Sequence, residues 1–432
     1  MSSTALRIGI AGLGTVGAAL AGLLREHGDL VSRRAGRPIQ ITAVSARDRG
    51  KDRGVDLSLY AWEDDPLAIA SRDDVDLVVE LIGGADGVAK QLVETALENG
   101  KHVVTANKAL LARHGIALAG LAEAHGRALN FEAAVAGGIP IIKSLREGFA
   151  GNRIHALYGI LNGTSNYILS EMRESGGAFA DVLKDAQEKG YAEADPSFDI
   201  DGIDAAHKLS ILSGLAFGVA PDFGAVSVAG IRSVSADDIM FAEELGYRIK
   251  LLGIARGAGD GRIEQSIEPC LIPEETPLAS VEGVYNAVFA AGDFVGSAML
   301  EGRGAGGGPT ASAVAADIVD IARGLVLPAY GVPVAALEEA RWAGDEEIEC
   351  AYYLRLCVTD KPGVVADISA ILRDYAISIE TMIQTARDPG QPVSLVMTLH
   401  ECARASMAAA AEKIERLECV AEKPVMLRIE RF

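Results

Sequence analysis

The feature that most constrains this chain is the alternation of apolar strands and helical segments along its first 150 or so residues. Apolar runs at 6–11, 39–48, 75–84 and 101–106 are separated by stretches with helical periodicity. Strands that are apolar on both faces, alternating with helices, are typical of a parallel sheet covered on both sides. Such sheets bind their ligands at the carboxyl ends of the strands. The sequence therefore predicts an α/β fold that opens with a parallel sheet.

A glycine-rich turn joins the first apolar run to the first helical segment. Gly12 permits a tight turn, Gly14 lets the backbone approach a pyrophosphate, and Gly17 lets helix and strand pack closely. The helix that follows offers free N–H groups and a partial positive charge, which suit a phosphate. We therefore predict a Rossmann-type sheet that binds a dinucleotide. The predicted contacts are the six residues of the turn, Gly12, Leu13, Gly14, Thr15, Val16 and Gly17.

The end of the second strand bears on the choice between NAD and NADP. An acidic residue at this place would hold the ribose 2′-hydroxyl of NAD. The strand runs instead into Ser45 and Arg47, and a guanidinium forms bidentate contacts with a phosphate. We therefore favour NADP as the cofactor. Asp48 leaves the use of NAD open, and a solvated basic loop is the alternative interpretation.

Size, charge and cysteine content exclude several classes of protein. A chain of 432 residues is too long for one ordinary core, which predicts two or three domains. A formal net charge of −20 disfavours nucleic-acid binding. No apolar run is long enough for a membrane helix, and the first residues do not resemble a signal peptide. Five cysteines without Cys-x-x-Cys spacing indicate reduced thiols in a cytoplasmic protein.

Beyond about residue 150 the pattern changes. A mixed α+β segment runs to roughly 300, followed by a glycine-rich turn and one more helix. The proline-spaced stretch 328–333 and the acidic stretch 343–349 indicate a linker, and the last eighty or so residues follow a β-α-β-β-α-β order. In the middle segment we predict helices at 165–175, 180–189, 203–217 and 235–247, and strands at 153–160, 249–256 and 263–272.

The stretch 190–208 holds five carboxylates and ends on a lysine. It is not a calcium loop, because the position that needs a bidentate Glu is taken by Lys208. Asp204 and Lys208 are four residues apart on a predicted helix and so share one face. Glu193 can be brought near them by a turn, as a partner for a substrate ammonium group, and Lys208 can supply a proton to a carbonyl. An ordinary surface salt bridge is the alternative interpretation.

Three further turns carry candidate site residues. Thr105 lies at the end of the strand at 101–106, and Lys108 follows it. Lys108 can orient a substrate or oxyanion there, or be a plain surface lysine. The irregular backbone at 132–140 exposes carbonyl oxygens that can collect a hard cation, although a simple chain reversal is the preferred interpretation on chemistry alone. Gly306 precedes a helix whose N-terminus can hold an anion or close over a cofactor, and no P-loop lysine follows it.

Six motifs in this order make the chain resemble the homoserine dehydrogenases, specifically the monofunctional bacterial type with a C-terminal ACT domain. The resemblance covers essentially the whole chain, and the set of motifs is far more specific than any one of them. The motifs are GLGTVG, TANKALLA, FEAAVAGGIPII, GILNGTSNYIL, GYAEADPSFDIDGIDAAHKL and GAGGGPTASAVAADI. Where the family often has Glu-Pro-Asp-Pro, this chain has Ala194 in the second position, so its loop is expected to be less rigid.

The resemblance implies NAD(P)H-linked reduction of aspartate 4-semialdehyde to homoserine, with roles for particular residues. Lys208 would be the acid/base, Lys108 would lie near nicotinamide and substrate, and Asp204 would position the substrate. Asp195, Asp199 and Asp201 are expected to shape the loop and cap the helix. The substrate-binding set is Glu193, Asp199, Asp204 and Lys208. The cofactor set adds Ser45, Arg47, Thr105, Lys108 and Gly306 to the glycine turn. The resemblance reverses the interpretation of the 132–140 turn, and the implied sodium ligands are Glu132, Val135, Gly137 and Ile139.

The resemblance also implies three domains and a regulated assembly. A Rossmann-type domain is expected at 1–135, completed by about 305–345, with a catalytic and dimerisation domain at 136–304. A ferredoxin-like ACT domain is expected at 350–432, with threonine as feedback inhibitor and a homodimer or homotetramer as the assembly. Two alternatives stay open at this point. One is a dehydrogenase of another small amino-acid aldehyde or alcohol, and the other is a regulatory protein that senses NAD(P) and an amino acid.

Overall fold

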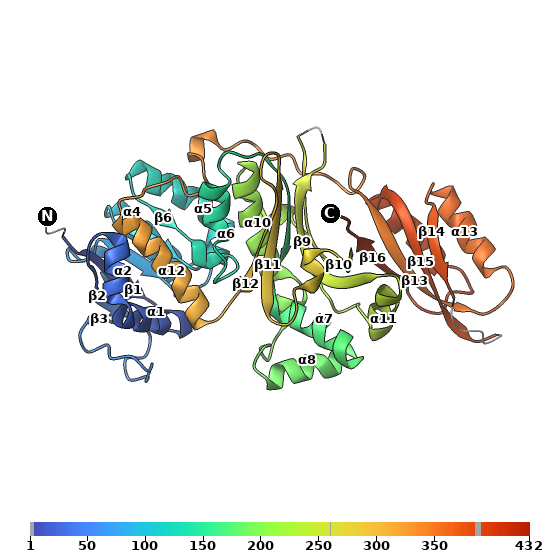
Figure 1. The fold of residues 1–432 in the computed structure, drawn as a ribbon, viewed down its shortest axis with the longest axis horizontal. Helices are drawn as coiled ribbons and strands as arrows, with labels where there is room; N and C mark the ends of the chain where they lie inside the picture. The colour runs from blue at the N-terminus through green and yellow to red at the C-terminus, as the bar shows by residue number, and fades with distance from the viewer. Residues whose placement is uncertain (1–3, 260, 385–389) are drawn as a thin grey trace. The chain divides into compact units, whose positions relative to one another are not determined.

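The computed structural model describes residues 4–259, 261–384 and 390–432. The chain divides into two compact units, each built from three separate segments. Figure 1 labels the helices and strands named below. The first unit contains Met1–Gly163, Asp204–Val226 and Tyr285–Ala340, and the second contains Thr164–Ile203, Ser227–Val284 and Arg341–Phe432. Among the described residues, no helix is both long and apolar enough to cross a membrane.

The first unit contains a six-stranded sheet in the order β3-β2-β1-β4-β5-β6. All its neighbouring strands pair in parallel, as their apolar sequences predict. In chain order the strands are β1 (Leu6–Ala11), β2 (Ile39–Ser45), β3 (Ala61–Glu63), β4 (Leu77–Glu80), β5 (His102–Thr105) and β6 (Leu129–Asn130). The strand order reverses between β1 and β4, and ligands of such sheets bind at this point. The predicted Rossmann-type fold is confirmed.

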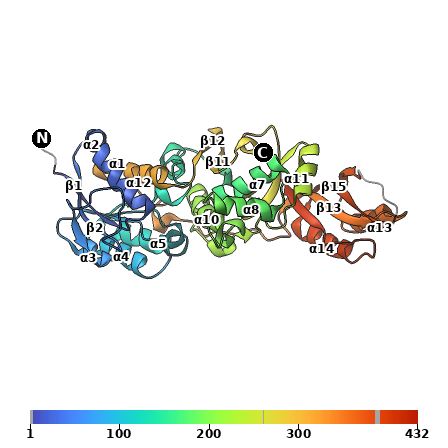
Figure 2. The same cartoon turned by 90° about the horizontal axis from the view of Figure 1, so that it is seen from below.

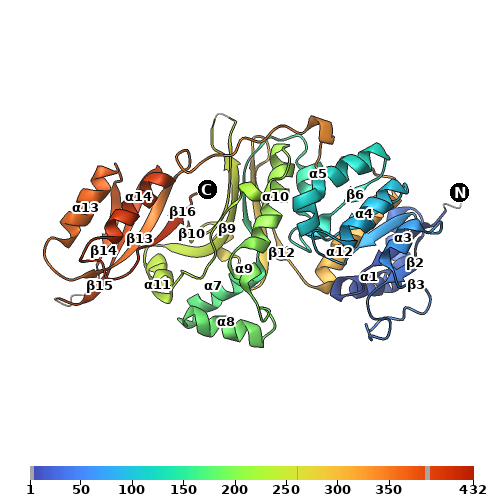
Figure 3. The ribbon, with the colours of Figure 1, turned by 180° about the vertical axis from the view of Figure 1, so that it is seen from behind.

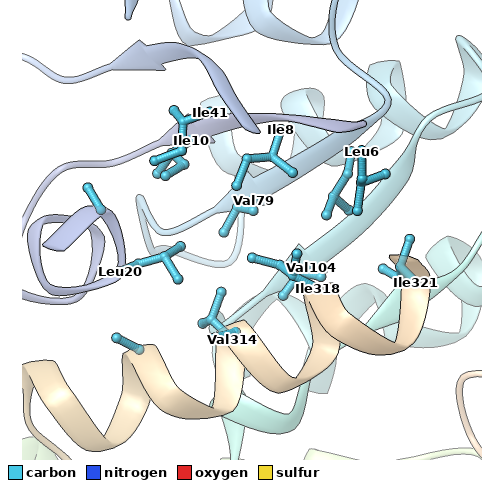
Figure 4. Packing of buried hydrophobic residues seen from close by; sticks show 14 of the residues in the cluster. Leu6, Ile8, Ile10, Leu20, Ile41, Val79, Val104, Val314, Ile318 and Ile321 are labelled. Atoms are coloured by element: carbon cyan, nitrogen blue, oxygen red, sulfur yellow. The ribbon is translucent and has the colours of Figure 1, made fainter. Parts of the chain in front are cut away.

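Helices cover both faces of this sheet (Figure 2). One face carries α1 (Thr15–Glu26), α2 (Gly28–Ala35) and α12 (Gly307–Ala322), and the other carries α3 (Pro66–Ser71), α4 (Val88–Glu98) and α5 (Lys108–Ala124). Figure 4 shows Val314 and Ile318 of α12 packed toward Val104 of the sheet and Leu20 of α1. A helix from late in the chain therefore completes the core of the N-terminal sheet.

The first unit also contains a three-stranded antiparallel sheet in the order β12-β11-β7. Its strands are β7 (Ile154–Ile160), β11 (Tyr285–Gly292) and β12 (Gly296–Arg303). Only β7 was among the predicted strands, because β11 and β12 are rich in Ala and Gly, which have low strand propensity. The long helix of this part is α10 (Ile203–Phe217), and the short elements are η1 (Glu132–Ala134), α6 (Ile141–Lys143), η2 (Ser144–Gly148), η3 (Phe223–Ala225) and η5 (Val334–Ala336).

The second unit joins a mixed sheet to the C-terminal β-α-β-β-α-β segment. Strand β10 pairs antiparallel with β9 and parallel with β16, so the sheet runs on into the C-terminal strands in the order β9-β10-β16-β13-β15-β14. Helices α13 and α14 lie on one face of those strands (Figure 3), and the predicted ferredoxin-like fold is confirmed. The C-terminal elements are β13 (Glu349–Thr359), α13 (Val364–Asp374), β14 (Ile379–Ile383), β15 (Pro392–Ala403), α14 (Arg404–Glu415) and β16 (Val425–Ile429).

The remaining elements of the second unit correct one prediction. The helix predicted at 235–247 ends at Glu244, and strand β9 begins at Tyr247, since Gly246 has a positive φ of 82° that ends the helix. These elements are α7 (Gly163–Ser175), α8 (Phe179–Glu188), α9 (Ser197–Ile200), β8 (Ser227–Val228), α11 (Ala236–Glu244), β9 (Tyr247–Gly257), β10 (Ile263–Pro273) and η4 (Pro277–Ser280).

Candidate functional site

The glycine-rich turn between β1 and α1 has the geometry of a phosphate cradle. Gly12 has a φ of 101°, and a Cβ there would lie 2.4 Å from the carbonyl oxygen of Leu81. A Cβ on Gly17 would lie 2.0 Å from the carbonyl oxygen of Gly12, so only glycine allows α1 to approach the strand this closely. A Cβ on Gly14 would meet no atom within 4 Å, and no side chain caps α1. The N-terminus of α1 is therefore uncapped by a side chain and has open space at Gly14, as a pyrophosphate site requires.

The N-terminus of α12 lies beside this cradle. A Cβ on Gly307 would come within 3.1 Å of the carbonyl oxygen of Thr15, the first residue of α1. Gly306 has a φ of 109° and precedes α12 without capping it by a side chain. Two helix N-termini, each with a partial positive charge, therefore converge where the sequence predicted a bound anion.

The loop after β2 bears the residues predicted to contact a 2′-phosphate. Arg47 is exposed, whereas Ser45 is buried and its carbonyl oxygen accepts a hydrogen bond from Gly12. Arg53 donates from Nε to the carbonyl oxygen of Leu13 at 2.9 Å, which ties this loop to the glycine-rich turn. That link could not be read from the sequence, because it joins residues forty positions apart in a loop without periodicity. The phosphate contacts of Ser45 and Arg47 stay predictions.

Two lysines and one aspartate meet at the start of α5 and α10. The Asp204 carboxylate lies 3.1 Å from Lys108 Nζ through Oδ1 and 2.7 Å from Lys208 Nζ through Oδ2. Asn162 donates to the same Oδ2 at 2.9 Å, and Lys208 donates to the carbonyl oxygen of Leu161 at 2.6 Å. The prediction that Asp204 and Lys208 share a helix face is therefore confirmed, and a second lysine joins them.

The three charged groups differ in exposure. The side chains of Asp204 and Lys208 are 8% and 10% exposed, whereas that of Lys108 is 31% exposed. Burial by itself opposes ionisation of Asp204, but the ammonium groups of Lys208 and Lys108 and the hydrogen bond from Asn162 hold its pKa well below the usual range. The cluster carries one negative and two positive charges, an arrangement that can stabilise a developing oxyanion and deliver a proton.

Thr105, predicted to contact the cofactor, is fully buried at the end of β5. Its hydroxyl donates to Glu80 at 2.6 Å and accepts from the backbone N–H of Asn107 at 3.0 Å. Sequence reasoning missed Glu80, although an acidic residue at the end of an otherwise apolar strand was a signal for it. The cofactor contact of Thr105 stays a prediction, while its observed bonds support the start of α5.

The acidic loop before α10 belongs to the second unit. Asp195 accepts a hydrogen bond from the backbone of Ser197 at 3.1 Å, which shapes the start of α9 as expected, and Asp201 forms an ion pair with Arg232. The Glu193 side chain is exposed, and its carbonyl oxygen accepts from Gln187. The Asp199 carbonyl oxygen accepts a hydrogen bond from Ser165. The substrate contacts predicted for Glu193 and Asp199 stay predictions.

The turn predicted to hold sodium is built around a buried carboxylate. Glu132 is 1% exposed, and its two oxygens accept from the backbone N–H groups of Ile142 and Lys143, each at 2.9 Å. Burial and the nearby Asp317 carboxylate raise the pKa of Glu132 to about 7. The Ile139 carbonyl oxygen accepts from Ile141.

Oxygen atoms of this kind retain further lone pairs, so the residues of the turn fit a hard cation. No group of three or more His, Cys, Asp or Glu side chains suited to a metal occurs in the described part of the chain. A sodium ion would therefore depend on main-chain carbonyls, and its binding stays a prediction. The predicted ligands are Glu132, Val135, Gly137 and Ile139.

Family models match almost the whole chain in three consecutive segments. The model described as homoserine dehydrogenase, NAD binding domain, matches residues 12–132. The model described as homoserine dehydrogenase matches residues 140–319, and the ACT domain model matches residues 352–419. The glycine-rich cradle thus lies in the first match, and Asp204 and Lys208 lie in the second.

Relatives and solved structures agree with these matches. A homoserine dehydrogenase of Neisseria gonorrhoeae is 50% identical and one of Pseudomonas aeruginosa 44% identical, covering 98% and 99% of both chains respectively. The crystal structure of a homoserine dehydrogenase from Thiobacillus denitrificans is 46% identical, has a TM-score of 0.93 and covers 99% of both chains. A hyperthermophilic archaeal homoserine dehydrogenase in complex with NADPH is 30% identical with a TM-score of 0.62, over 73% of this chain and 97% of that one. This chain therefore belongs to the homoserine dehydrogenase family of oxidoreductases, with an NAD-binding domain and a C-terminal ACT domain.

Proposed function

We propose that this enzyme catalyses the reversible reduction of L-aspartate 4-semialdehyde to L-homoserine, in the aspartate pathway that leads to threonine and methionine. The observation that carries the proposal is the cluster of Lys108, Asp204 and Lys208, because it combines a sheltered proton donor with a site for negative charge. Lys108 begins α5 directly after β5, at the sheet edge where the cofactor-binding cradle also lies.

The proposed chemistry divides between the cofactor and the cluster. A bound nicotinamide supplies or accepts the hydride. In the direction of reduction, protonated Lys208 gives its Nζ proton to the carbonyl oxygen of the aldehyde, and Lys108 stabilises the charge that develops there. In the direction of oxidation, neutral Lys208 takes the hydroxyl proton of homoserine, so alkaline pH favours this direction. Asp204 stays ionised throughout and orients both lysines.

Cofactor preference, substrate contacts and a sodium site belong to the same proposal. We infer a preference for NADP from the exposed Arg47, which belongs to the loop that Arg53 ties to the cradle. Glu193 would bind the ammonium group of the substrate, and Asp199 would also contact the substrate. A sodium ion would be held by Glu132 and the carbonyl groups of the 132–139 turn.

Regulation and assembly are proposed from the ACT match alone. We propose that threonine binds the ACT domain as a feedback inhibitor and that the enzyme is a homodimer or homotetramer. The five cysteines without Cys-x-x-Cys spacing support our further proposal that it is cytoplasmic. The proposed domains are a cofactor domain at 1–135 completed by about 305–345, a catalytic domain at 136–304 and the ACT domain at 350–432.

Two buried lysines make a matched test of the proposal. Lys208 and Lys101 both donate to backbone carbonyl oxygens, but Lys101 bonds Arg72 and Val75 away from the cluster. Purified wild-type protein should oxidise homoserine with NADP at alkaline pH. Lys208→Met should abolish this turnover while binding of NADP persists, and Lys101→Met should lower thermal stability but leave kcat near the wild-type value. A wild-type protein inactive on homoserine, or an active Lys208→Met variant, would refute the proposal.

A further inference from the structure

A carboxylate outside the lysine cluster is fully buried at the carboxyl end of β4. Glu80 is 0% exposed and pairs in register with Thr105 of β5. Its Oε1 accepts from the backbone N–H groups of Ile82 and Gly83, at 2.8 and 3.0 Å, and its Oε2 accepts from the Thr105 hydroxyl at 2.6 Å. A carboxylate only accepts hydrogen bonds, so it satisfies three donors that an amide side chain cannot satisfy together.

The Thr105 hydroxyl connects Glu80 to the backbone of Asn107 through two hydrogen bonds. Because its hydroxyl proton points to Glu80, the lone pairs of Oγ1 are free to accept from the backbone N–H of Asn107 at 3.0 Å. The Asn107 side chain then donates to the Gly84 carbonyl oxygen at 2.7 Å and accepts from the Leu110 backbone at 3.1 Å. Asn107 thereby caps α5, whose first residue is Lys108.

We propose that Glu80 is a positioning residue for the dehydrogenase reaction, because through Thr105 and Asn107 it sets the start of α5 and so holds Lys108 in reach of Asp204. Burial keeps Glu80 from touching substrate or cofactor, so it acts through the other residues of this chain of hydrogen bonds. The same carboxylate also fixes the backbone of the loop after β4. The proposal rests on the proposed function, since it assumes that Lys108 takes part in the reaction.

Three variants and one control separate this role from general stability. Glu80→Gln keeps the side-chain shape but puts an amide N–H group where a donor already points, or else leaves the Thr105 hydroxyl proton without an acceptor. Thr105→Val removes the hydroxyl and leaves the two backbone bonds of Glu80 intact, whereas Thr105→Ser retains the hydroxyl. Thr42→Val is the matched control, because Thr42 of the same sheet donates its hydroxyl to the carbonyl oxygens of Asp74 and Ile8, away from the start of α5.

Steady-state kinetics and amide hydrogen exchange test the proposal together. We expect Glu80→Gln and Thr105→Val each to lower kcat by roughly 10- to 100-fold, since small displacements of a catalytic group have effects of this size. Thr105→Val should change the KM for homoserine little, and Thr105→Ser should restore most of the kcat that Thr105→Val loses. Thr42→Val should keep the wild-type kcat, and the double variant should be no slower than Glu80→Gln because the groups act as one unit. Exchange over residues 105–112 should rise in both slow variants.

The outcomes distinguish failure of this inference from failure of the proposed function. A wild-type protein that does not oxidise homoserine refutes the function, and the exchange data then still decide whether Glu80 orders the start of α5. Unchanged kcat in Glu80→Gln and Thr105→Val overturns the positioning role, whether or not exchange rises. Lower kcat with unchanged exchange at α5 overturns it as well, because the effect would then reach the reaction by another route.

Discussion

Replacing Asp204 by Asn measures how much protein stability and activity depend on the one buried negative charge between the two lysines. At the observed 2.7 Å and 3.1 Å, Coulomb attraction to Lys208 and Lys108 is ~6 and ~5 kcal/mol at an effective dielectric constant of about 20. Most of this attraction offsets the cost of burying the charges. Removing one partner leaves that cost uncompensated, so we expect a loss of about 3–5 kcal/mol in the free energy of unfolding. Activity should fall roughly 100-fold, because the proton donor loses its orientation.

The dependence of this loss on pH carries a definite sign. The pKa of Asp204 is depressed in the folded state, so its charge stabilises the fold fully above the unfolded-state pKa of roughly 3.9. That stabilisation is lost as the pH falls through the lower pKa of the folded state. The difference in stability between wild type and Asp204→Asn should therefore be constant from about pH 8 to pH 5 and shrink below about pH 4.

An exposed pair with the same geometry provides the control. Asp185 of α8 and Lys189, the residue directly after that helix, are also four positions apart and also lie 2.7 Å apart, but their side chains are 40% and 48% exposed. Thermal unfolding followed by circular dichroism should show a large decrease in Tm for Asp204→Asn and almost none for Asp185→Asn. Equal decreases in Tm for the two variants, or full activity of Asp204→Asn, would refute the reasoning that stability and activity depend on the burial of the Asp204 charge.

Three shorter predictions concern the cofactor and substrate contacts. Arg47→Ala should raise the Kd for NADP by roughly 10- to 100-fold, because one charge-assisted bond is lost, and should leave the Kd for NAD unchanged. An equal rise in both Kd values in fluorescence titrations would exclude a 2′-phosphate contact. Gly307→Ala should raise the KM for the cofactor, because the new Cβ would press on α1. Gly308→Ala should not raise it, because a Cβ at that position meets no atom within 4 Å. Identical KM values for the two variants would contradict the convergence of the two helix N-termini. Gln187→Ala should raise the KM for homoserine but not for NADP, since Gln187 holds the backbone of Glu193, and an unchanged KM would remove that role.

Much of the fold could be predicted because its signals are local. Apolar runs indicated β1, β2, β4 and β5 of the parallel sheet, and periodicity located α10 at 203–217, as observed. Strands β11 and β12 gave no such signal, since Ala and Gly form strands only when neighbouring strands supply hydrogen bonds and packing. The helix predicted at 235–247 was too long, because apolar residues continue from α11 into β9 and only Gly246 marks the break.

Part of the candidate site could also be predicted from local signals in the sequence. The spacing of Asp204 and Lys208 placed them on one helix face, which is a property of any α-helix. The approach of Lys108 to the same carboxylate depends on how α5 and α10 pack within the first unit, and no spacing in the sequence encodes it. Thr105 could be placed at a strand end, but the polarity of its hydroxyl is set by Glu80 on the neighbouring strand.

By itself, the sequence determined strands β1, β2, β4 and β5, the glycine-rich turn and the lysine of α10, because these follow from backbone sterics and from the period of a helix or strand. The family could be inferred from the order of six motifs, and the comparisons agree with it. Only the tertiary structure decided that one aspartate bridges two lysines, that a late helix completes the N-terminal core, and that Glu80 orders the start of α5. These features depend on contacts between residues far apart in the chain, where burial and hydrogen-bond geometry determine which groups meet.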